Sequence, residues 1–125
     1  MKEVIGIEIV ADAIEDAKKN ALANGRDNIS FICADASKGA NELIRRNIKP
    51  DVVIVDPPRK GLDDGTIDAI KVMSPERLVY VSCDPSTLAR DVAKLQGSYE
   101  LKEVQPVDMF PMTNHVETVC LLSKR

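Results

Sequence analysis

The sequence predicts an α/β fold in which helices cover a mostly parallel sheet. Short apolar runs alternate with stretches whose apolar residues recur at helical spacing, and this alternation is typical of strand–helix–strand units. One central run is nearly continuous in Val and Ile, as in strands that are buried on both faces. With 125 residues, 44% of them hydrophobic, the chain suits one small domain or a portion of a larger one.

The first half of the chain is predicted to alternate between strands and helices. Apolar residues at helical spacing followed by Asn24-Gly25 define the first helix, and Pro50 separates the second helix from the third strand. The predicted elements are, in order, a strand over 4–10, a helix that begins near Asp12, a strand over 29–34, a helix over 37–46 and a strand over 51–55.

The second half continues this pattern and ends in two strands. Pro57 and Pro58 must lie in a loop, because proline removes a hydrogen bond of the ladder. Asp84 is expected to cap a helix whose first residue is Pro85. The last two strands are joined by a segment too short for a helical crossover, so we expect them to be antiparallel neighbours. The predicted elements are a helix over 66–72, a strand over 77–82, a helix from Pro85 to a stop at Gly97, and strands over 99–107 and 118–122.

The composition argues against several classes of protein. The net charge is −3, aromatic residues make up 3% and Trp is absent, so the chain lacks the basic surface and the stacking platform of a self-sufficient nucleic-acid binder. Three cysteines without a C-x-x-C pair indicate neither a disulfide framework nor a metal site, and a reducing cytoplasm is the expected location. No apolar run approaches the roughly 20 residues of a membrane span.

Acidic residues stand at the ends of the first three predicted strands: Glu8, Asp35 and Asp56. Ligands of such sheets bind beyond the carboxyl ends of the strands, where a carboxylate can accept hydrogen bonds from ribose hydroxyls or an amino group. Each acid alone has a simpler interpretation as a solvated loop residue, and Asp35 as a helix cap. Their shared position favours a ligand site.

Cys83 is the strongest candidate for a nucleophile. It follows a predicted strand and precedes a helix N-terminus, where free N–H groups and the helix dipole stabilise a thiolate. Cys33 and Cys120 fall within or at the end of predicted strands, and we interpret them as small buried hydrophobic residues.

Glu117 precedes a strongly apolar strand, and a carboxylate that enters a buried strand needs a partner or a chemical task. It is a candidate general base, and the alternative is an ion pair, for example with Arg90. His115, the sole histidine, is interpreted as structural.

Four segments, spread from near the first residue to near the last, match a known family. They are Val4-Ile5-Gly6-Ile7-Glu8, Asp56-Pro57-Pro58-Arg59-Lys60-Gly61, Ser82-Cys83-Asp84-Pro85-Ser86-Thr87-Leu88-Ala89-Arg90-Asp91, and Asp108-Met109-Phe110-Pro111-Met112-Thr113-Asn114-His115-Val116-Glu117. In these segments the chain resembles the RNA 5-methyluridine methyltransferases, which comprise the 23S rRNA (uracil-5-)-methyltransferases and the related tRNA enzymes. The bacterial 23S rRNA branch is the more similar.

The resemblance implies a Rossmann-like class I S-adenosylmethionine-dependent methyltransferase fold and an RNA substrate, rRNA ahead of tRNA. It implies that Cys83 attacks C6 of uracil, that C5 then takes the methyl group of S-adenosylmethionine, and that Glu117 removes the C5 proton. Glu8, Asp35 and Asp56 correspond to cofactor-site acids, with Asp56 also near the target base. The resemblance implies no metal.

Two departures from the family pattern carry expectations. The family's first strand, its Gly-rich loop and its upstream RNA-binding region have no counterpart in the segments above. We therefore expect residues 1–125 to be a truncated, C-terminal portion of the catalytic domain, inactive alone, with a gap in the sheet at which two chains dimerise. The second departure is Asp84, where the family usually has Asn. Its charge opposes thiolate formation at Cys83.

Two other functions stay open. A methyltransferase that acts on amino groups of adenine or guanine would explain the Asp-Pro-Pro loop, although such enzymes usually have an aromatic residue where this chain has Arg59. A non-catalytic nucleotide-binding or assembly module would explain the short length. Neither gives a task to Cys83 or Glu117.

Overall fold

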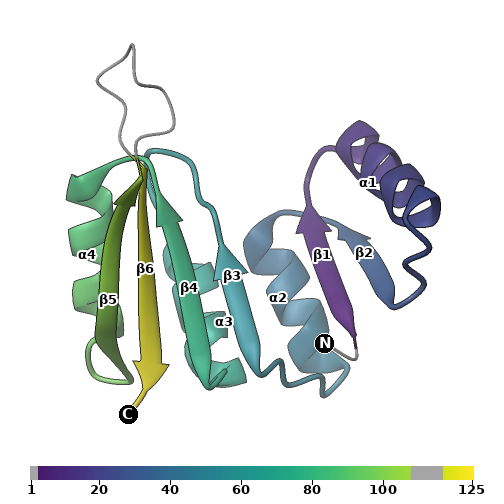
Figure 1. Cartoon of the computed structure of the whole chain (residues 1–125). Coiled ribbons are helices and arrows are strands. Elements are labelled where there is room, and N and C mark those ends of the chain that lie inside the picture. The colour runs from purple at the N-terminus through teal and green to yellow at the C-terminus, as the bar shows by residue number, and fades with distance from the viewer. Residues whose placement is uncertain (1–2, 108–116) are drawn as a thin grey trace. The chain divides into compact units, whose positions relative to one another are not determined.

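The structure is a computed structural model that describes residues 3–107 and 117–125. Strands and helices alternate until the last two strands, as the sequence predicts (Figure 1). The elements are β1 (Val4–Glu8), α1 (Ala11–Ala23), β2 (Ile29–Cys33), α2 (Ala36–Arg45), β3 (Val52–Val55), α3 (Asp64–Met73), β4 (Arg77–Ser82), α4 (Pro85–Leu95), β5 (Tyr99–Val107) and β6 (Glu117–Lys124).

The chain divides into two compact units, Met1–Arg46 and Asn47–Arg125. In the first, β1 and β2 form a parallel pair whose register runs from Val4 with Ile29 to Glu8 with Cys33. Helix α2 packs against β1 so closely that a side chain at Gly39 would overlap Ile7. A larger residue at this position would have to displace the Ile7 side chain.

The second unit holds a four-stranded sheet in the order β3-β4-β6-β5. Strands β3 and β4 are parallel, whereas β6 lies between β4 and β5 and is antiparallel to both. This confirms the predicted antiparallel pair. Helices α3 and α4 are both drawn behind this sheet (Figure 1). Alternate residues of the central strands are fully buried there, namely Leu78, Tyr80, Cys120 and Leu122, as the two-residue period of a strand requires.

Helices α1 and α3 begin at other residues than the sequence predicts. The first strand ends at Glu8, and α1 begins at Ala11 with Val10 in the cap position. Asp12 and Glu15 have the spacing of a capping box, which predicts Asp12 as the cap, but Asp12 lies within the first turn of the helix, so this prediction is wrong. Helix α3 begins two residues before the predicted start, because the Asp63 carboxylate accepts a hydrogen bond from the Thr66 N–H at 2.8 Å. Within the described ranges, no helix is both long and apolar enough to cross a bilayer.

Candidate active site

The turn from β4 to α4 carries Cys83. Asp84 takes an extended conformation in the cap position, with φ −138°, and its carboxylate accepts from the Ser86 N–H at 2.8 Å. Pro85 occupies the start of the helix. The predicted cap is thus confirmed, and the half-buried Cys83 stands immediately before a helix N-terminus, where the helix dipole favours an anion.

The hydroxyl of Ser82 holds the backbone on both sides of Cys83. The hydroxyl group donates to the Asp84 carbonyl at 2.9 Å, and its oxygen accepts from the Asp84 N–H at 3.1 Å. Ser82 itself is only 3% exposed, and both bonds are partly buried. Sequence reasoning assigned Ser82 no role, although a serine next to a helix cap commonly bonds to nearby backbone groups.

The register of β4 and β6 brings Cys83 and Glu117 to the same end of the sheet. The last paired residues are Ser82 and Thr118, and the next residue along the ladder is Cys83 on one strand and Glu117 on the other. Glu117 also pairs with Val107 of β5 and is half-buried. Cys83 and Glu117 are therefore the residues that directly follow the last pair of this ladder on the two strands.

Asp56 lies at the carboxyl end of the neighbouring strand. Val55 pairs with Tyr80 in the parallel ladder of β3 and β4, and Asp56 follows at once as an exposed residue. Beyond it, the Gly61 N–H donates to the Pro58 carbonyl at 2.9 Å and closes a turn. Parallel strands end at one edge, so Asp56 and Cys83 share the edge of the sheet at which ligands of such folds bind.

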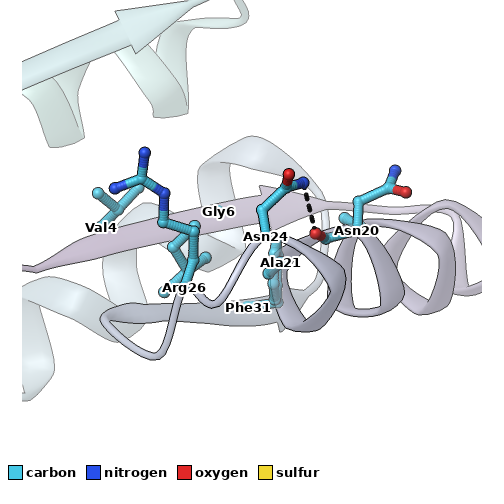
Figure 2. Close-up of a pocket in the computed structure, with 9 residues that line it drawn as sticks. Val4, Gly6, Asn20, Ala21, Asn24, Arg26 and Phe31 are labelled. Carbon is cyan, nitrogen blue, oxygen red and sulfur yellow. Dashed lines mark hydrogen bonds between the residues drawn. The ribbon is translucent and has the colours of Figure 1, made fainter.

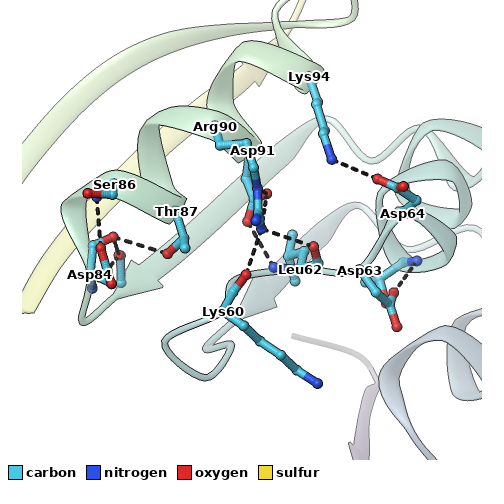
Figure 3. Close-up of polar contacts among 12 residues, drawn as sticks. Lys60, Leu62, Asp63, Asp64, Asp84, Ser86, Thr87, Arg90, Asp91 and Lys94 are labelled. Carbon is cyan, nitrogen blue, oxygen red and sulfur yellow. Dashed lines mark hydrogen bonds and ion pairs between the residues drawn. The ribbon is translucent and has the colours of Figure 1, made fainter.

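Three side chains of α4 bind the backbone of the loop that follows Asp56, and Figure 3 draws the bonds of two of them, Arg90 and Asp91. The Thr87 hydroxyl donates to the Arg59 carbonyl at 2.9 Å, and the Arg90 guanidinium donates to the Lys60 carbonyl at 2.6 Å. The Asp91 carboxylate accepts from the N–H of Leu62 at 2.8 Å. We call Thr87, Arg90 and Asp91 the loop clamp. Sequence reasoning missed it, because no local pattern marks side chains that bind a backbone 28 to 30 residues away.

Asp91 is the centre of a buried polar network. Its side chain is fully buried and accepts from the Tyr80 hydroxyl at 2.6 Å and from the Arg90 guanidinium at 3.1 Å. Burial, together with the bond to Asp91, raises the pKa of Tyr80 above its ordinary value, so this hydroxyl is a permanent donor. Arg90 forms its ion pair with Asp91, so the structure does not support the alternative in which Arg90 pairs with Glu117.

Glu8 and Asp35 lie at the carboxyl edge of the two-stranded sheet in the other unit. The Glu8 carboxylate accepts from the Val10 N–H at 3.2 Å, and Asp35 caps α2 by accepting from the Lys38 N–H at 2.8 Å. The simpler interpretation of Asp35 as a cap is thus correct. A carboxylate can accept about four hydrogen bonds, so both groups remain suited to ribose hydroxyls or an adenine amino group.

One cavity lined by described residues does not coincide with these acids. It has a volume of about 610 Å³ and lies between α1 and the amino ends of β1 and β2, where Val4, Ile29 and Arg26 line it (Figure 2). Figure 2 also shows the Asn24 amide, which donates to the Asn20 carbonyl at 2.8 Å within this lining. Ligands of parallel sheets bind at the opposite, carboxyl ends, so we assign no site to this cavity.

Two predicted features lie beyond what the structure describes. His115 and most of the segment from Asp108 to Glu117 fall outside the described residues, and only Glu117 of that segment is inside them. Within residues 3–107 and 117–125, no cluster of three or more His, Cys, Asp or Glu side chains has the arrangement of a metal site.

Comparison with known proteins places the chain among methyltransferases. The family model described as tRNA (Uracil-5-)-methyltransferase matches residues 1–125. Two relatives, from Enterococcus faecalis and Oceanobacillus iheyensis, are described as uncharacterized RNA methyltransferases. They are 50% and 54% identical over 98% of this chain, which spans 27% of each relative.

Solved structures agree with this placement. The tRNA (uracil-54, C5)-methyltransferase of Pyrococcus abyssi, solved with S-adenosyl-L-homocysteine, is 39% identical and has a TM-score of 0.83 over 96% of this chain and 28% of its own. A putative SAM-dependent methyltransferase of Streptococcus mutans has a TM-score of 0.79 at 14% identity over 97% of this chain and 38% of its own, which shows the fold alone.

Proposed function

Because this chain belongs to the tRNA (uracil-5-)-methyltransferase family, we propose that it carries the covalent part of an active site that methylates C5 of uridine in RNA. Its fold is that of the class I S-adenosylmethionine-dependent methyltransferases, with an α/β arrangement of mostly parallel strands. The observation that supports the catalytic pair most directly is the register of β4 and β6. Its last pair is Ser82 with Thr118, and Cys83 and Glu117 are the residues directly beyond that pair.

Cys83 is the proposed nucleophile. Uracil C5 is a weak nucleophile, and attack of a thiolate on C6 forms a C–S bond and turns C5 into an enolate carbon that can take a methyl group. The helix N-terminus favours the thiolate, and the Ser82 ring restricts the backbone of Cys83. The target base has to leave any stack to reach this position.

Glu117 is the proposed general base. After methylation, C5 carries both the methyl group and a proton. Removal of this proton by the carboxylate returns an electron pair that breaks the C6–S bond and releases Cys83. A base must lie within hydrogen-bonding reach of the proton, and the neighbouring positions of Cys83 and Glu117 at the end of the β4–β6 ladder are compatible with this requirement.

S-Adenosylmethionine, the cofactor of this fold and family, supplies an electrophilic methyl group when bound. We propose that Glu8 and Asp35 accept hydrogen bonds from its adenosine part, and that Asp56 lies near both the cofactor and the target base. The support is that all three carboxylates stand at or just beyond the carboxyl ends of strands and that donors to carboxylates are abundant on adenosine.

The substrate is proposed to be RNA in a cytoplasmic setting. The four sequence segments favour ribosomal RNA, whereas the family model and the Pyrococcus abyssi enzyme carry tRNA in their names. With a net charge of −3, the chain itself offers little general attraction for phosphates, so we propose that most RNA contacts come from other regions.

We also propose that residues 1–125 are the C-terminal portion of a catalytic domain and are inactive alone. The chain spans about a quarter of the length of the curated relatives it matches. Dimerisation of the isolated chain through unpaired strand edges stays a prediction.

The covalent route is tested with the full-length protein, S-adenosylmethionine and RNA that contains 5-fluorouridine. Fluorine at C5 cannot leave as a cation, so wild-type protein should accumulate a protein–RNA adduct that survives a denaturing gel. Cys83→Ala should form no adduct and no 5-methyluridine. Glu117→Gln should accumulate an adduct with ordinary RNA, because elimination needs the base. Chain 1–125 alone should give no product.

Cys33→Ala is the matched control, since Cys33 is an exposed thiol outside the proposed pair. It should behave as the wild type. Unchanged methylation in Cys83→Ala would exclude the covalent route, and mass spectrometry that finds N-methylated adenosine or guanosine would favour amino-group methylation. Parallel assays on ribosomal and transfer RNA identify the substrate.

A further inference from the structure

We infer that Arg90 and Asp91 are positioning residues that hold the Asp56 loop, residues 56–62, against α4 and so keep Asp56 aligned with Cys83. This inference rests on the proposed function, since it assumes that Asp56 and Cys83 act on one base. It concerns the motif Ser86-Thr87-Leu88-Ala89-Arg90-Asp91, to which the proposed reaction assigns no chemical task.

The clamp side chains form one row on α4. Thr87, Arg90 and Asp91 are three and four residues apart, which places them on the same face of the helix. They bind backbone groups of Arg59, Lys60 and Leu62, which are nearly consecutive. Because the bonds go to the backbone, they hold the path of the loop independently of the identity of its side chains. Figure 3 shows the Lys60 side chain directed away from α4.

The buried charge of Asp91 argues against a role in packing alone. Asp91 is fully buried, and taking a carboxylate out of water costs several kcal/mol unless its oxygens are bonded. Here the bonds come from three elements: Tyr80 on β4, Arg90 on α4 and Leu62 in the loop. Apolar residues of similar volume would often be as stable, so the network is better explained by the geometry that it imposes.

Gly61 allows the loop to approach this network. Its φ is +80°, and an added Cβ would lie 2.6 Å from both the Arg90 Nη2 and the Asp91 Oδ2 atoms. A side chain at this position would therefore be strained in its backbone and would push the loop away from α4. The contact of Gly61 with α4 is as close as packing permits.

The Asp56 loop and the start of α4 carry the residues of the proposed chemistry. Asp56 begins the loop, and Pro57 and Pro58 stiffen the path between it and the clamp. Cys83 stands two residues before α4 begins at Pro85. A displacement of the loop along α4 would therefore shift Asp56 relative to Cys83, and a misplacement of about 1 Å can cost about 100-fold in rate.

The first test compares Arg90→Ala with Lys94→Ala in the full-length protein. Lys94 lies one turn further along α4 and pairs with Asp64 at 2.7 Å, outside the loop, so it controls for the loss of a cation on the same helix. Arg90→Ala should lower kcat about 100-fold, with the KM for RNA within about threefold, and slow the 5-fluorouridine adduct equally. Lys94→Ala should stay within about twofold of wild type.

Chemical rescue of Arg90→Ala distinguishes a loss of loop positioning from a general loss of folding. The Arg90 side chain is 45% exposed, so added ethylguanidinium can reach the site that Arg90→Ala leaves, and it should restore kcat at least about tenfold. Gly61→Ala should reproduce the loss of kcat, whereas Gly97→Ala, where an added Cβ meets nothing within 4 Å, should not.

Amide hydrogen exchange at Leu62 measures how firmly the clamp holds the loop, and it does not depend on catalysis. Exchange should be about tenfold faster in Arg90→Ala and unchanged in Lys94→Ala. If the wild type forms the adduct and Arg90→Ala keeps both its kcat and its exchange rate, the inference is wrong and the proposed function stands. If exchange rises in Arg90→Ala but no protein, wild type included, forms an adduct, the proposed function fails and the positioning role fails with it.

Discussion

Cys83 differs from the other two cysteines in its surroundings. Cys33 is exposed, and Cys120 is buried in β6, where burial raises the pKa of its thiol. Cys83 is half-buried at a helix N-terminus, next to the ring that the Ser82 hydroxyl closes. The sequence predicted the special position of Cys83 correctly but predicted burial for Cys33, which is wrong because Cys33 stands at the exposed end of its strand.

Asp84 lets the effect of charge on Cys83 be measured without loss of the helix cap. Asp84→Asn keeps an oxygen that accepts from Ser86 N–H but removes the negative charge beside the thiol. Two charges 4 Å apart in water interact by about 1 kcal/mol, so iodoacetamide should modify Cys83 about fivefold faster at pH 7. Peptide mass spectrometry measures the rate, with Cys33 as the internal reference.

Asp63→Asn is the matched control, because Asp63 caps α3 in the same way but belongs to no cysteine-bearing turn. It should leave the alkylation rate of Cys83 unchanged. An unchanged or slower rate in Asp84→Asn would show that the adjacent charge does not oppose the thiolate.

At the scale of elements, aspartates cap three of the four helices in the described part of the chain. Asp35, Asp63 and Asp84 each accept a backbone N–H of the first turn, whereas α1 has Val10 in the cap position and no side-chain cap bond. Sequence patterns predicted the strands 77–82 and 99–107 with their observed ends. They predicted the start of α1 less well, because the capping-box spacing of Asp12 and Glu15 favours a later start, whereas α1 begins without a side-chain cap.

The cap of α3 has a predictable effect on stability. Hydrogen bonds from Thr66 hold the pKa of Asp63 below its ordinary value of 3.8. Asp63→Ala should lower the free energy of unfolding by about 1 kcal/mol at pH 7. Because the folded pKa is lowered, this stabilisation is present above about pH 4 and is lost as the pH falls through the folded pKa. Urea unfolding at pH 7 and pH 3 measures the difference.

Asp68→Ala serves as the control on the same helix. Asp68 is exposed in the interior of α3, and alanine has the higher helix propensity, so its stability should be equal or slightly greater. A gap between wild type and Asp63→Ala that is as large at pH 3 as at pH 7 would contradict the role of the ionised cap.

At the scale of the whole molecule, the hydrophobic core is concentrated in one unit. Among the described residues, 15 hydrophobic side chains are buried, and only Ile14, Ala40 and Leu43 of these belong to residues 1–46. The four-stranded sheet and the clamp also lie entirely within residues 47–125. The proposed catalytic pair therefore stands on the unit with the larger core.

This distribution predicts different behaviour of the two units when they are separated. Residues 47–125 alone should show a cooperative thermal transition by circular dichroism, because they bury most of the apolar side chains. Residues 1–46 alone should show none, since chains near this length rarely bury enough surface to fold by themselves. A broad, non-cooperative melt of residues 47–125 would contradict this assignment of the core.

The sequence by itself determined the order of strands and helices, the turn that carries Cys83 and the antiparallel final pair. These depend on local patterns: apolar periodicity, two prolines after β3 and an Asp-Pro helix start. Only the tertiary structure decided that β6 lies next to β4, with Cys83 and Glu117 just beyond the last pair of their ladder, and that α4 binds the backbone of the loop after Asp56. The bonds from α4 to the loop join residues 28 to 30 positions apart. The local sequence pattern of each partner would be the same if the two segments did not pack together, so the pattern does not predict the contact.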